Sequence, residues 1–520
     1  MGLYDFTIYN IIKHNAIVYK DRIAWKFGDQ VITHSQFHEN INRLAHGLVD
    51  AGLQKGDRIG ILAQNSLDYI YLYGASAQIG SIVVPISWRL KPKEIEYIIS
   101  DAHPKILFIE SEFQEMIGKM ASRFWFIERC FILDKPMEGF VFFKDLLGNK
   151  GGEIQSDVGS NDTFVILYTA ASSGEPKGAA LSHQNLIYYN LQTMCVWRLT
   201  HEDININLLP FFHTQGLVVC LSVMQAGGLN IIIPKFDADL AIKHIQEDRV
   251  TVFSEFAPML TTILDKAREG NFDLSSLRII TGLDSYDTIR RLEELTSATF
   301  WTGYGQTETS GGSVSLAPYL KKPGSAGVCA LLSEVKIVDH SGKNVETGEA
   351  GEIVVRGPMV FKGYWNREKE TEYTFRGGWH HTGDKGYLDA DGYLWFIGRL
   401  TEKDLIKTGG ENVYPEEVEK VILEHPFVEQ VVVFGVPDSQ WGEAVKAVCV
   451  LKKGQSMDEE DLMNFVANRI ARFKKPKYVS FVSSLPKNIG GDINRERVKA
   501  LYREEMGVKK EKQQSGVVEE

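Results

Sequence analysis

The residues with the most evident chemistry stand in the segment 168–183, YTAASSGEPKGAALSH, where an apolar run gives way to a loop of small residues. Residues 170–174 are alanine, serine and glycine, so their backbone N–H groups and two hydroxyls can approach a polyanion closely. Lys177 adds a positive point charge. This composition favours a cradle for a triphosphate. A second interpretation stays open, in which the segment is a Ser/Gly hairpin turn with an incidental lysine.

The loop differs from the common GxxxxGK[ST] nucleotide loop. Pro176 stands directly before Lys177, and proline has no N–H group to donate and disfavours a helix that starts there. The run 163–169, TFVILYT, is short, apolar and rich in strand formers, so we predict a buried strand leading into the loop. Beyond the loop, Ser182 is positioned to cap a helix that runs through Asn190.

The chain on both sides of this loop alternates strand-like with helix-like segments. We predict helices at 35–52, capped by Ser35, and at 67–79, 92–100, 239–246, 258–266 and 287–295. We predict strands at 57–63, 230–233 and 299–303, and near residues 82, 105, 251 and 278. The alternation indicates βα units, largely parallel sheets and two layered α/β subdomains.

The pattern changes twice further on. From about Gly324, strand-like runs lie between glycine turns, which predicts a β-rich subdomain. After Arg399 come a charged stretch, a glycine pair, a helix at 415–423, strands near 431 and 447, and a helix at 459–470. We therefore predict an N-terminal domain of residues 1–399 and a small α+β C-terminal domain of residues 400–520. Its polar tail is expected to be disordered from about residue 508.

Composition excludes several classes of protein. The 520 residues carry a formal net charge of -11, which argues against a nucleic-acid partner. The five cysteines are far apart and lack CxxC spacing, so neither a disulfide framework nor a zinc site is indicated, and we expect a cytoplasmic protein. The sequence contains no run of about 18 apolar residues, so we expect no integral membrane segment. The oligomeric state stays open, a homodimer included.

Five segments together resemble the motif series of the adenylate-forming acyl-CoA synthetases across nearly the whole chain: YTAASSGEPKG, FFHTQG, YGQTETSG, HTGDKGYLDADGYLWFIGR and DLIKTGGENVYPEEVE. The resemblance implies that the protein activates a carboxylate with ATP to an acyl-adenylate and releases pyrophosphate. It also implies that the small C-terminal domain is mobile and rotates about a hinge, so that coenzyme A can attack the adenylate.

The same resemblance implies a set of nucleotide contacts. In-line attack on the α-phosphorus gathers negative charge, so donors and Mg²⁺ must be aimed at the phosphates. The implied phosphate-loop residues are Thr169, Ser172, Ser173, Gly174 and Lys177. The implied contacts to the rest of ATP are Gly282, Leu283 and Asp284 beside adenine, Tyr304 stacked on it, Thr307 at the α-phosphate, and Asp384 and Arg399 at the ribose. Glu308 is the implied Mg²⁺ ligand.

Other residues are implied to serve the acid and coenzyme A. His213 resembles the histidine at the carboxylate end of the acyl tunnel, although a lone histidine between apolar residues is more often part of a core. Lys407 resembles a lysine that acts in the thioester-forming state, where Gly409 and Gly410 would let the pantetheine arm pass. A solvated lysine is the alternative. We expect a fatty or similarly apolar acid, of undetermined length and shape.

Two departures from the family pattern stand out. Ala170 and Ala171 replace a serine and a glycine. More seriously, LPKNIGGDINR puts Asp492 where the family carries its adenylation lysine. Losing one charge-stabilising group costs about 3 kcal/mol, on the order of a hundredfold to a thousandfold in rate. Either Lys487 or Lys403 serves instead, or adenylation is slow. A binding protein that has lost catalysis and an enzyme that loads a carrier protein therefore stay open as alternatives.

Overall fold

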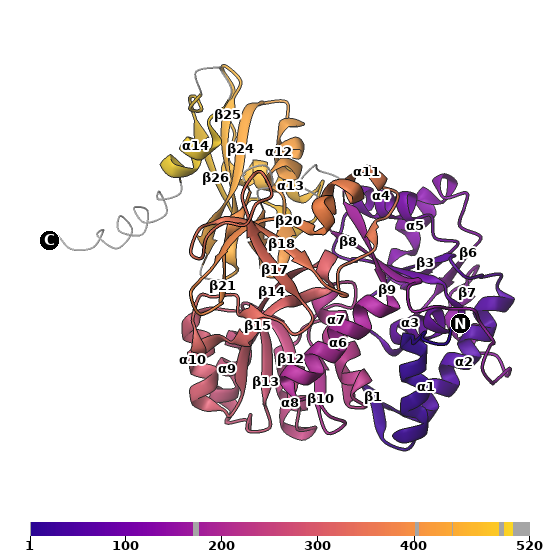
Figure 1. The fold of residues 1–520 in the computed structure, drawn as a ribbon. Helices are drawn as coiled ribbons and strands as arrows, with labels where there is room; N and C mark the ends of the chain where they lie inside the picture. The colour runs from indigo at the N-terminus through magenta and orange to yellow at the C-terminus, as the bar shows by residue number, and fades with distance from the viewer. Residues whose placement is uncertain (1, 170–175, 401–404, 439, 488–492, 503–520) are drawn as a thin grey trace. The chain divides into compact units, whose positions relative to one another are not determined.

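The computed structural model describes residues 2–169, 176–400, 405–438, 440–487 and 493–502. The chain divides into two compact units. Among the described residues, the large unit comprises residues 2–88, 94–169 and 176–400, and the small unit comprises residues 89–93, 405–438, 440–487 and 493–502. The predicted fold class is confirmed, since the large unit combines α/β layers with a β-rich sheet and the small unit is α+β (Figure 1).

The first sheet of the large unit pairs its strands in the order β16, β15, β14, β13, β12, β10, β11, β1, β2. In that order the strands are Val328–Cys329, Gly311–Pro318, Thr299–Gln306, Ile279–Leu283, Val252–Phe256, Ile204–Asn207, Leu229–Ile232, Ile23–Phe27 and Gln30–Thr33. The strands from β14 to β11 run parallel. The carboxyl ends of β12, β13 and β14 therefore share one edge, which is where open α/β sheets bind ligands.

The second sheet has the order β19, β9, β8, β4, β3, β5, β6, β7. In that order its strands are Gly363–Tyr364, Lys177–Ser182, Thr163–Thr169, Ile82–Ile86, Arg58–Leu62, Ile106–Ile109, Arg129–Ile132 and Val141–Phe142. Strand β8 has the predicted bounds. Strand β9 was not predicted, because its Gly-Ala-Ala run lacks the β-branched side chains that mark strands. It forms because it pairs antiparallel with β8 from Thr169 to Thr163.

The third sheet confirms the β-rich region that was predicted from about residue 324. It pairs β17, β18, β20 and β21 in that order, and every pair is antiparallel. These strands are Glu334–Val338, Gly351–Arg356, His380–Leu388 and Leu394–Arg399.

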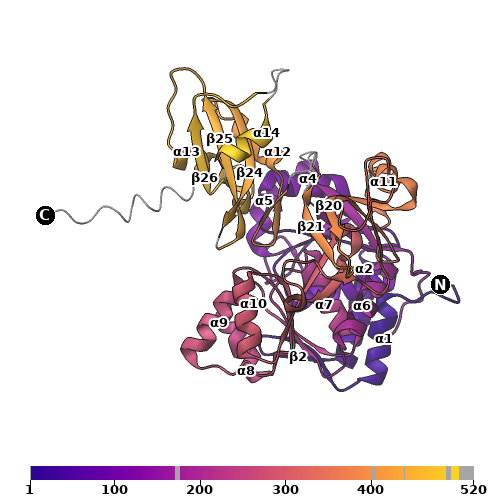
Figure 2. The same cartoon turned by 60° about the vertical axis from the view of Figure 1, so that its left-hand side comes forward.

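Helices cover the first two sheets. Up to residue 400 they are α1 Ile8–Val18, α2 His34–Asp50, α3 Leu67–Ile79, α4 Pro92–Ala102, α5 Gln114–Met120, α6 His183–Trp197, α7 Thr214–Gln225, α8 Ala238–Glu247, α9 Met259–Gly270, α10 Tyr286–Leu295 and α11 Glu368–Thr374. Figure 2 shows α8, α9 and α10 on one side of the first sheet and α6 and α7 on the other. Among the described residues, no helix combines the length and apolar character that crossing a bilayer requires.

The predicted cap of the helix at 35–52 was wrong by two residues. Thr33, not Ser35, caps α2: its hydroxyl accepts from the Gln36 N–H, and the Gln36 side chain accepts from the Thr33 N–H. This reciprocal pair satisfies two backbone N–H groups that have no partner within the helix. Thr33 therefore caps the helix in preference to Ser35, because a glutamine stands three residues after the threonine.

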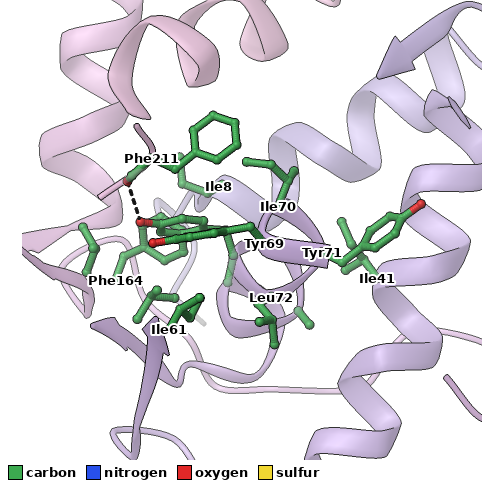
Figure 3. Packing of buried hydrophobic residues seen from close by; sticks show 14 of the residues in the cluster. Ile8, Ile41, Ile61, Tyr69, Ile70, Tyr71, Leu72, Phe164 and Phe211 are labelled. Carbon is green, nitrogen blue, oxygen red and sulfur yellow. Dashed lines mark hydrogen bonds between the residues drawn. The ribbon is translucent and has the colours of Figure 1, made fainter. Parts of the chain in front are cut away.

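The largest core lies between the two α/β sheets and holds the His213 segment in place. The Asn65 amide donates to Leu209 O at 3.0 Å, and its oxygen accepts from the Phe211 N–H at 2.9 Å. The Tyr73 hydroxyl donates to Phe211 O at 3.2 Å. Figure 3 shows Phe211 beside Tyr69, whose rings meet edge to face at 5.8 Å. Buried hydrogen bonds of this kind fix the backbone that leads into α7.

The small unit has its own sheet and core. Its strands are β22 Ile406–Thr408, β23 Glu411–Val413, β24 Val428–Asp438, β25 Gly442–Leu451 and β26 Tyr478–Val482, and its helices are α12 Pro415–Leu423, α13 Glu459–Ala467 and α14 Arg495–Tyr502. Helix α12 has the predicted bounds, since proline fits the first helical position. The tail predicted to be disordered lies outside the described residues.

Candidate active site

The predicted phosphate loop joins two antiparallel strands. Thr169 at the end of β8 pairs with Lys177 at the start of β9, and the Thr169 hydroxyl donates to Lys177 O at 3.4 Å. Ser172, Ser173 and Gly174 lie outside the described residues. Strands β8 and β9 are paired on either side of this segment, and its role as a phosphate cradle stays a prediction. The half-buried Lys177 side chain lies over the ring of Tyr364, with Nζ 5.3 Å from the ring centroid.

Tyr304 makes a polar contact that the sequence did not predict. Its ring is buried and stacks against Phe396 at a centroid distance of 6.1 Å. Its hydroxyl donates to Asp384 Oδ2 at 2.6 Å. Burial and the negative charge of Asp384 raise the pKa of Tyr304 well above its usual range, so this phenol remains a hydrogen-bond donor.

Asp384 is the centre of a buried polar cluster. Its side chain is 4% exposed, and its Oδ1 lies 2.8 Å from Arg399 Nε in an ion pair. The Gln306 amide donates to Oδ2 at 2.7 Å, alongside the Tyr304 hydroxyl. Strands β20 and β21 set this geometry, since Asp384 and Arg399 are paired residues. Sequence reasoning missed Gln306, although it stands within the YGQTE motif.

Thr307 and the His213 segment meet at the carboxyl edge of the first sheet. Thr307 begins the 3₁₀ turn Thr307–Thr309 that follows β14. The hydroxyl of Thr214, the first residue of α7, donates to Thr307 Oγ1 at 3.1 Å. His213 immediately precedes that helix and is half-buried, with its ring 4.8 Å from the Phe212 ring. The structure therefore brings Thr307 into contact with the residue that directly follows His213.

Glu308, in the same turn, is held by the segment around β19. The Tyr364 hydroxyl donates to Glu308 Oε1 at 2.8 Å, and the Phe361 N–H donates to Glu308 O at 2.8 Å. The other carboxylate oxygen, Oε2, makes no hydrogen bond or ion pair to a described residue. Magnesium is usually bound by one or two carboxylates together with substrate phosphates. A carboxylate oriented in this way fits that role.

The segment Gly282–Asp284 ends β13 at the same edge. Gly282 has φ +152°, and a Cβ there would lie 1.9 Å from Glu255 O, so only glycine fits. Leu283 is 45% exposed, which suits a backbone that lines a ligand. The Glu255 carboxyl beneath it is fully buried, and neither oxygen has a hydrogen-bond partner among the described residues. Burial, with Asp284 nearby, raises the pKa of Glu255 well above its usual value.

The remaining predicted residues lie in the small unit. Lys407 is exposed on β22, and its backbone N–H donates to Glu443 Oε2 at 2.8 Å. Gly409 and Gly410 form the turn between β22 and β23, with φ +55° and +82°. Two positive φ values in a two-residue hairpin turn favour glycine for conformational reasons alone. Lys487 is exposed, whereas Asp492 and Lys403 lie outside the described residues.

Comparison with known proteins identifies the family of the chain. The AMP-binding enzyme family model matches residues 12–365, and the model of the AMP-binding enzyme C-terminal domain matches residues 417–491. The chain therefore belongs to the AMP-binding enzyme family. Within that family it is an AMP-forming carboxylate–CoA ligase, with ATP and coenzyme A as co-substrates.

Three relatives show the range of acids within this class. The chain is 32% identical over 501 residues to the indoleacetate–CoA ligase of Aromatoleum aromaticum, covering 94% of this chain and 97% of that one. It is 33% identical over 494 residues to a feruloyl-CoA synthase of an Amycolatopsis species, and the match covers 92% of this chain and 96% of that one. A structure of a Mycobacterium tuberculosis fatty acyl CoA synthetase is 28% identical to this chain, with a TM-score of 0.72. The match covers 96% of this chain and 98% of that one.

Proposed function

We propose that the protein activates a fatty or similarly apolar carboxylic acid with ATP, releases pyrophosphate, and transfers the acyl group from the adenylate to coenzyme A. The observation that carries this proposal is the 3.1 Å hydrogen bond from Thr214 to Thr307, next to His213. It supports a site in which the acid's carboxylate approaches the α-phosphate. Effective catalysis requires the two reacting groups to be held in that proximity.

The residue roles in this proposal are those that the family resemblance implies. Thr307 donates to the α-phosphate, the Asp384 cluster accepts from the ribose hydroxyls, and Gly282, Leu283 and Asp284 line the adenine with Tyr304. Thr169, Lys177 and the loop 170–174 hold the outer phosphates. Glu308 would hold Mg²⁺, which when bound neutralises developing phosphate charge. The five free cysteines support a cytoplasmic location.

We propose that the functional boundary lies between residues 399 and 400 and that the C-terminal domain moves between the two half-reactions. Lys407 then acts in the thioester-forming state. Gly409 and Gly410, which lack side chains at a tight turn, leave room for the pantetheine arm.

The acid's apolar character is supported by the surroundings of His213. Phe211 and Phe212 precede it in the sequence and are buried, and Trp301, which is half-buried on β14, is proposed to line the same tunnel. Indoleacetate, ferulate and fatty acids, which give the three relatives their names, share an apolar body and one carboxylate. Surfaces of this kind stabilise such acids by burying their apolar area.

The experiment that tests the proposal measures pyrophosphate release from ATP and Mg²⁺ with short, medium, long and aromatic acids, with and without coenzyme A. We expect one class of apolar acid to stimulate release, with continued turnover only when coenzyme A is present. His213→Ala should raise the KM for that acid, while His201→Ala, at a half-buried histidine that pairs with Glu202, serves as a control. Release that is independent of any acid would contradict the proposal.

One sequence feature favours a second candidate function. Asp492 replaces the expected adenylation lysine, and its negative charge would repel the phosphate. In this alternative the protein binds ATP and acyl-CoA but adenylates very slowly. Asp492→Lys should then raise the rate of acid-dependent pyrophosphate release by about a hundredfold. If the substitution leaves that rate unchanged, another cation already serves and the first proposal stands.

A further inference from the structure

Tyr364 contacts two of the residues on which ATP binding is proposed to depend. Its hydroxyl donates to Glu308 Oε1 at 2.8 Å, and its ring faces Lys177 Nζ at 5.3 Å from the centroid. We propose that Tyr364 is a positioning residue that orients the metal-binding carboxylate and the phosphate-loop lysine relative to each other. This inference rests on the proposed function and extends it to a residue outside the predicted site.

The backbone of Tyr364 is fixed independently of its side chain. Strand β19 pairs antiparallel with β9, which places Tyr364 opposite Ala179, close to Lys177 in the same strand. The Tyr364 N–H donates to Thr371 Oγ1 at 2.9 Å. The preceding Gly363 has φ +141°, and a Cβ there would lie 2.6 Å from Thr371 Cγ2. The chain can therefore follow this path only with glycine at 363.

The hydroxyl and the ring of Tyr364 do different things. The hydroxyl donates to Oε1 of Glu308, so it holds the carboxylate in one orientation and leaves Oε2 for a cation. Hydrogen bonds to charged acceptors are stronger than those between neutral groups. The ring offers its negative face to the Lys177 ammonium at a distance typical of cation–π pairs. Phe361 packs edge to face on the same ring at 4.9 Å, which limits its rotation.

Two substitutions separate these contributions. Tyr364→Phe removes the hydroxyl and keeps the ring, so it should release the Glu308 carboxylate without disturbing Lys177. Tyr364→Leu removes both. A matched control is Tyr71→Phe, which deletes a hydroxyl that accepts from Asn40 Nδ2 at 3.0 Å between α2 and α3. The Tyr71 side chain is labelled in Figure 3.

The test is calorimetric titration of the full-length protein with ATP, either in excess Mg²⁺ or in EDTA. For each variant the ratio of the two affinities gives the enhancement due to Mg²⁺. Tyr364→Phe should reduce that enhancement about tenfold, equivalent to about 1.4 kcal/mol, and leave the affinity in EDTA unchanged. Tyr364→Leu should weaken binding in both buffers, and Tyr71→Phe in neither.

A Glu308→Gln background provides the coupling test. In that background the Mg²⁺ enhancement of ATP affinity is already small, so adding Tyr364→Phe should change it less than twofold. A purely structural role of Tyr364 would instead produce the same loss in the Glu308→Gln background as in the unsubstituted protein. An unchanged Mg²⁺ enhancement in Tyr364→Phe overturns the inference and leaves the proposed function standing. Failure of the unsubstituted protein to bind ATP in either buffer would overturn both.

Discussion

Replacing Asp384 with asparagine gives the sharpest test of the proposed ribose site. Asparagine keeps the shape of the side chain but offers one acceptor and one N–H donor. Its amide nitrogen must face either Arg399 or the donors Tyr304 and Gln306, so at least one contact becomes donor to donor. Arg399 is only 15% exposed and would lose its ion pair with Asp384. We expect a loss of about 3 kcal/mol in the free energy of unfolding.

Binding measurements separate this destabilisation from a role in recognition. If Asp384 accepts from both ribose hydroxyls, the unsubstituted protein should bind ATP about tenfold more tightly than 2′-deoxyATP, the value of one hydrogen bond to a charged acceptor. In Asp384→Asn this preference should fall to about threefold or less. The assay is competitive titration of both nucleotides at a temperature where the variant remains folded.

Asp203→Asn is the matched control. Asp203 is 5% exposed, pairs with Arg278 at 2.6 Å and lies just before β10, at the end of the parallel strands opposite the site. Because Arg278 is 41% exposed, this substitution should cost less, about 1 to 2 kcal/mol. The preference for ATP over 2′-deoxyATP should be unchanged. A tenfold preference retained by Asp384→Asn would refute the ribose assignment.

Three further predictions concern other parts of the chain. Because the pKa of Glu255 is raised, the folded state binds more protons than the unfolded state at pH values above the ordinary carboxyl pKa, so the free energy of unfolding falls as pH rises. Glu255→Gln should therefore make the thermal midpoint fall less between about pH 5 and pH 8. A midpoint with the same pH dependence as in the unsubstituted protein would count against this. Gly282→Ala should lower the free energy of unfolding by about 2 kcal/mol or more, because the added Cβ would overlap Glu255 O. Gly118→Ala is the control and should not destabilise the protein, because a Cβ at Gly118 meets nothing within 4 Å. Equal effects of the two substitutions would argue against strain at Gly282. Lys407→Ala should leave acid-dependent pyrophosphate release intact and slow thioester formation about a hundredfold, as followed by rapid-quench kinetics. An equal loss of rate in both steps would refute the role of Lys407 in the thioester-forming state.

Much of the fold follows from local sequence signals. Strand β8 and helix α12 have the predicted bounds, because an apolar β-branched run ending in small residues and a proline at a helix start each act over a few residues. Strand β9 was missed because its small residues carry no strand signal of their own, and pairing with β8 decides its conformation. Helix α1 also went unpredicted.

The candidate site was predictable only as a collection of motifs. The sequence pointed to Tyr304 and Asp384 separately, but their 2.6 Å hydrogen bond depends on how β14 and β20 are brought together. Tyr364 carried no signal that would distinguish it from any aromatic residue in a loop. Its importance arises from contacts with Lys177 and Glu308, which are distant in the sequence. Side-chain partners of this kind are set by tertiary packing, which local pattern does not encode.

The most direct test of the central claim is a single-turnover experiment with the best acid from the panel, analysed by mass spectrometry. The protein is first mixed with ATP, Mg²⁺ and the acid, and coenzyme A is added afterwards. We predict an enzyme-bound acyl-adenylate in the first stage and its conversion to acyl-CoA and AMP in the second. Acyl-CoA that forms without a detectable adenylate and with release of ADP, or an adenylate that coenzyme A does not consume, would contradict the account.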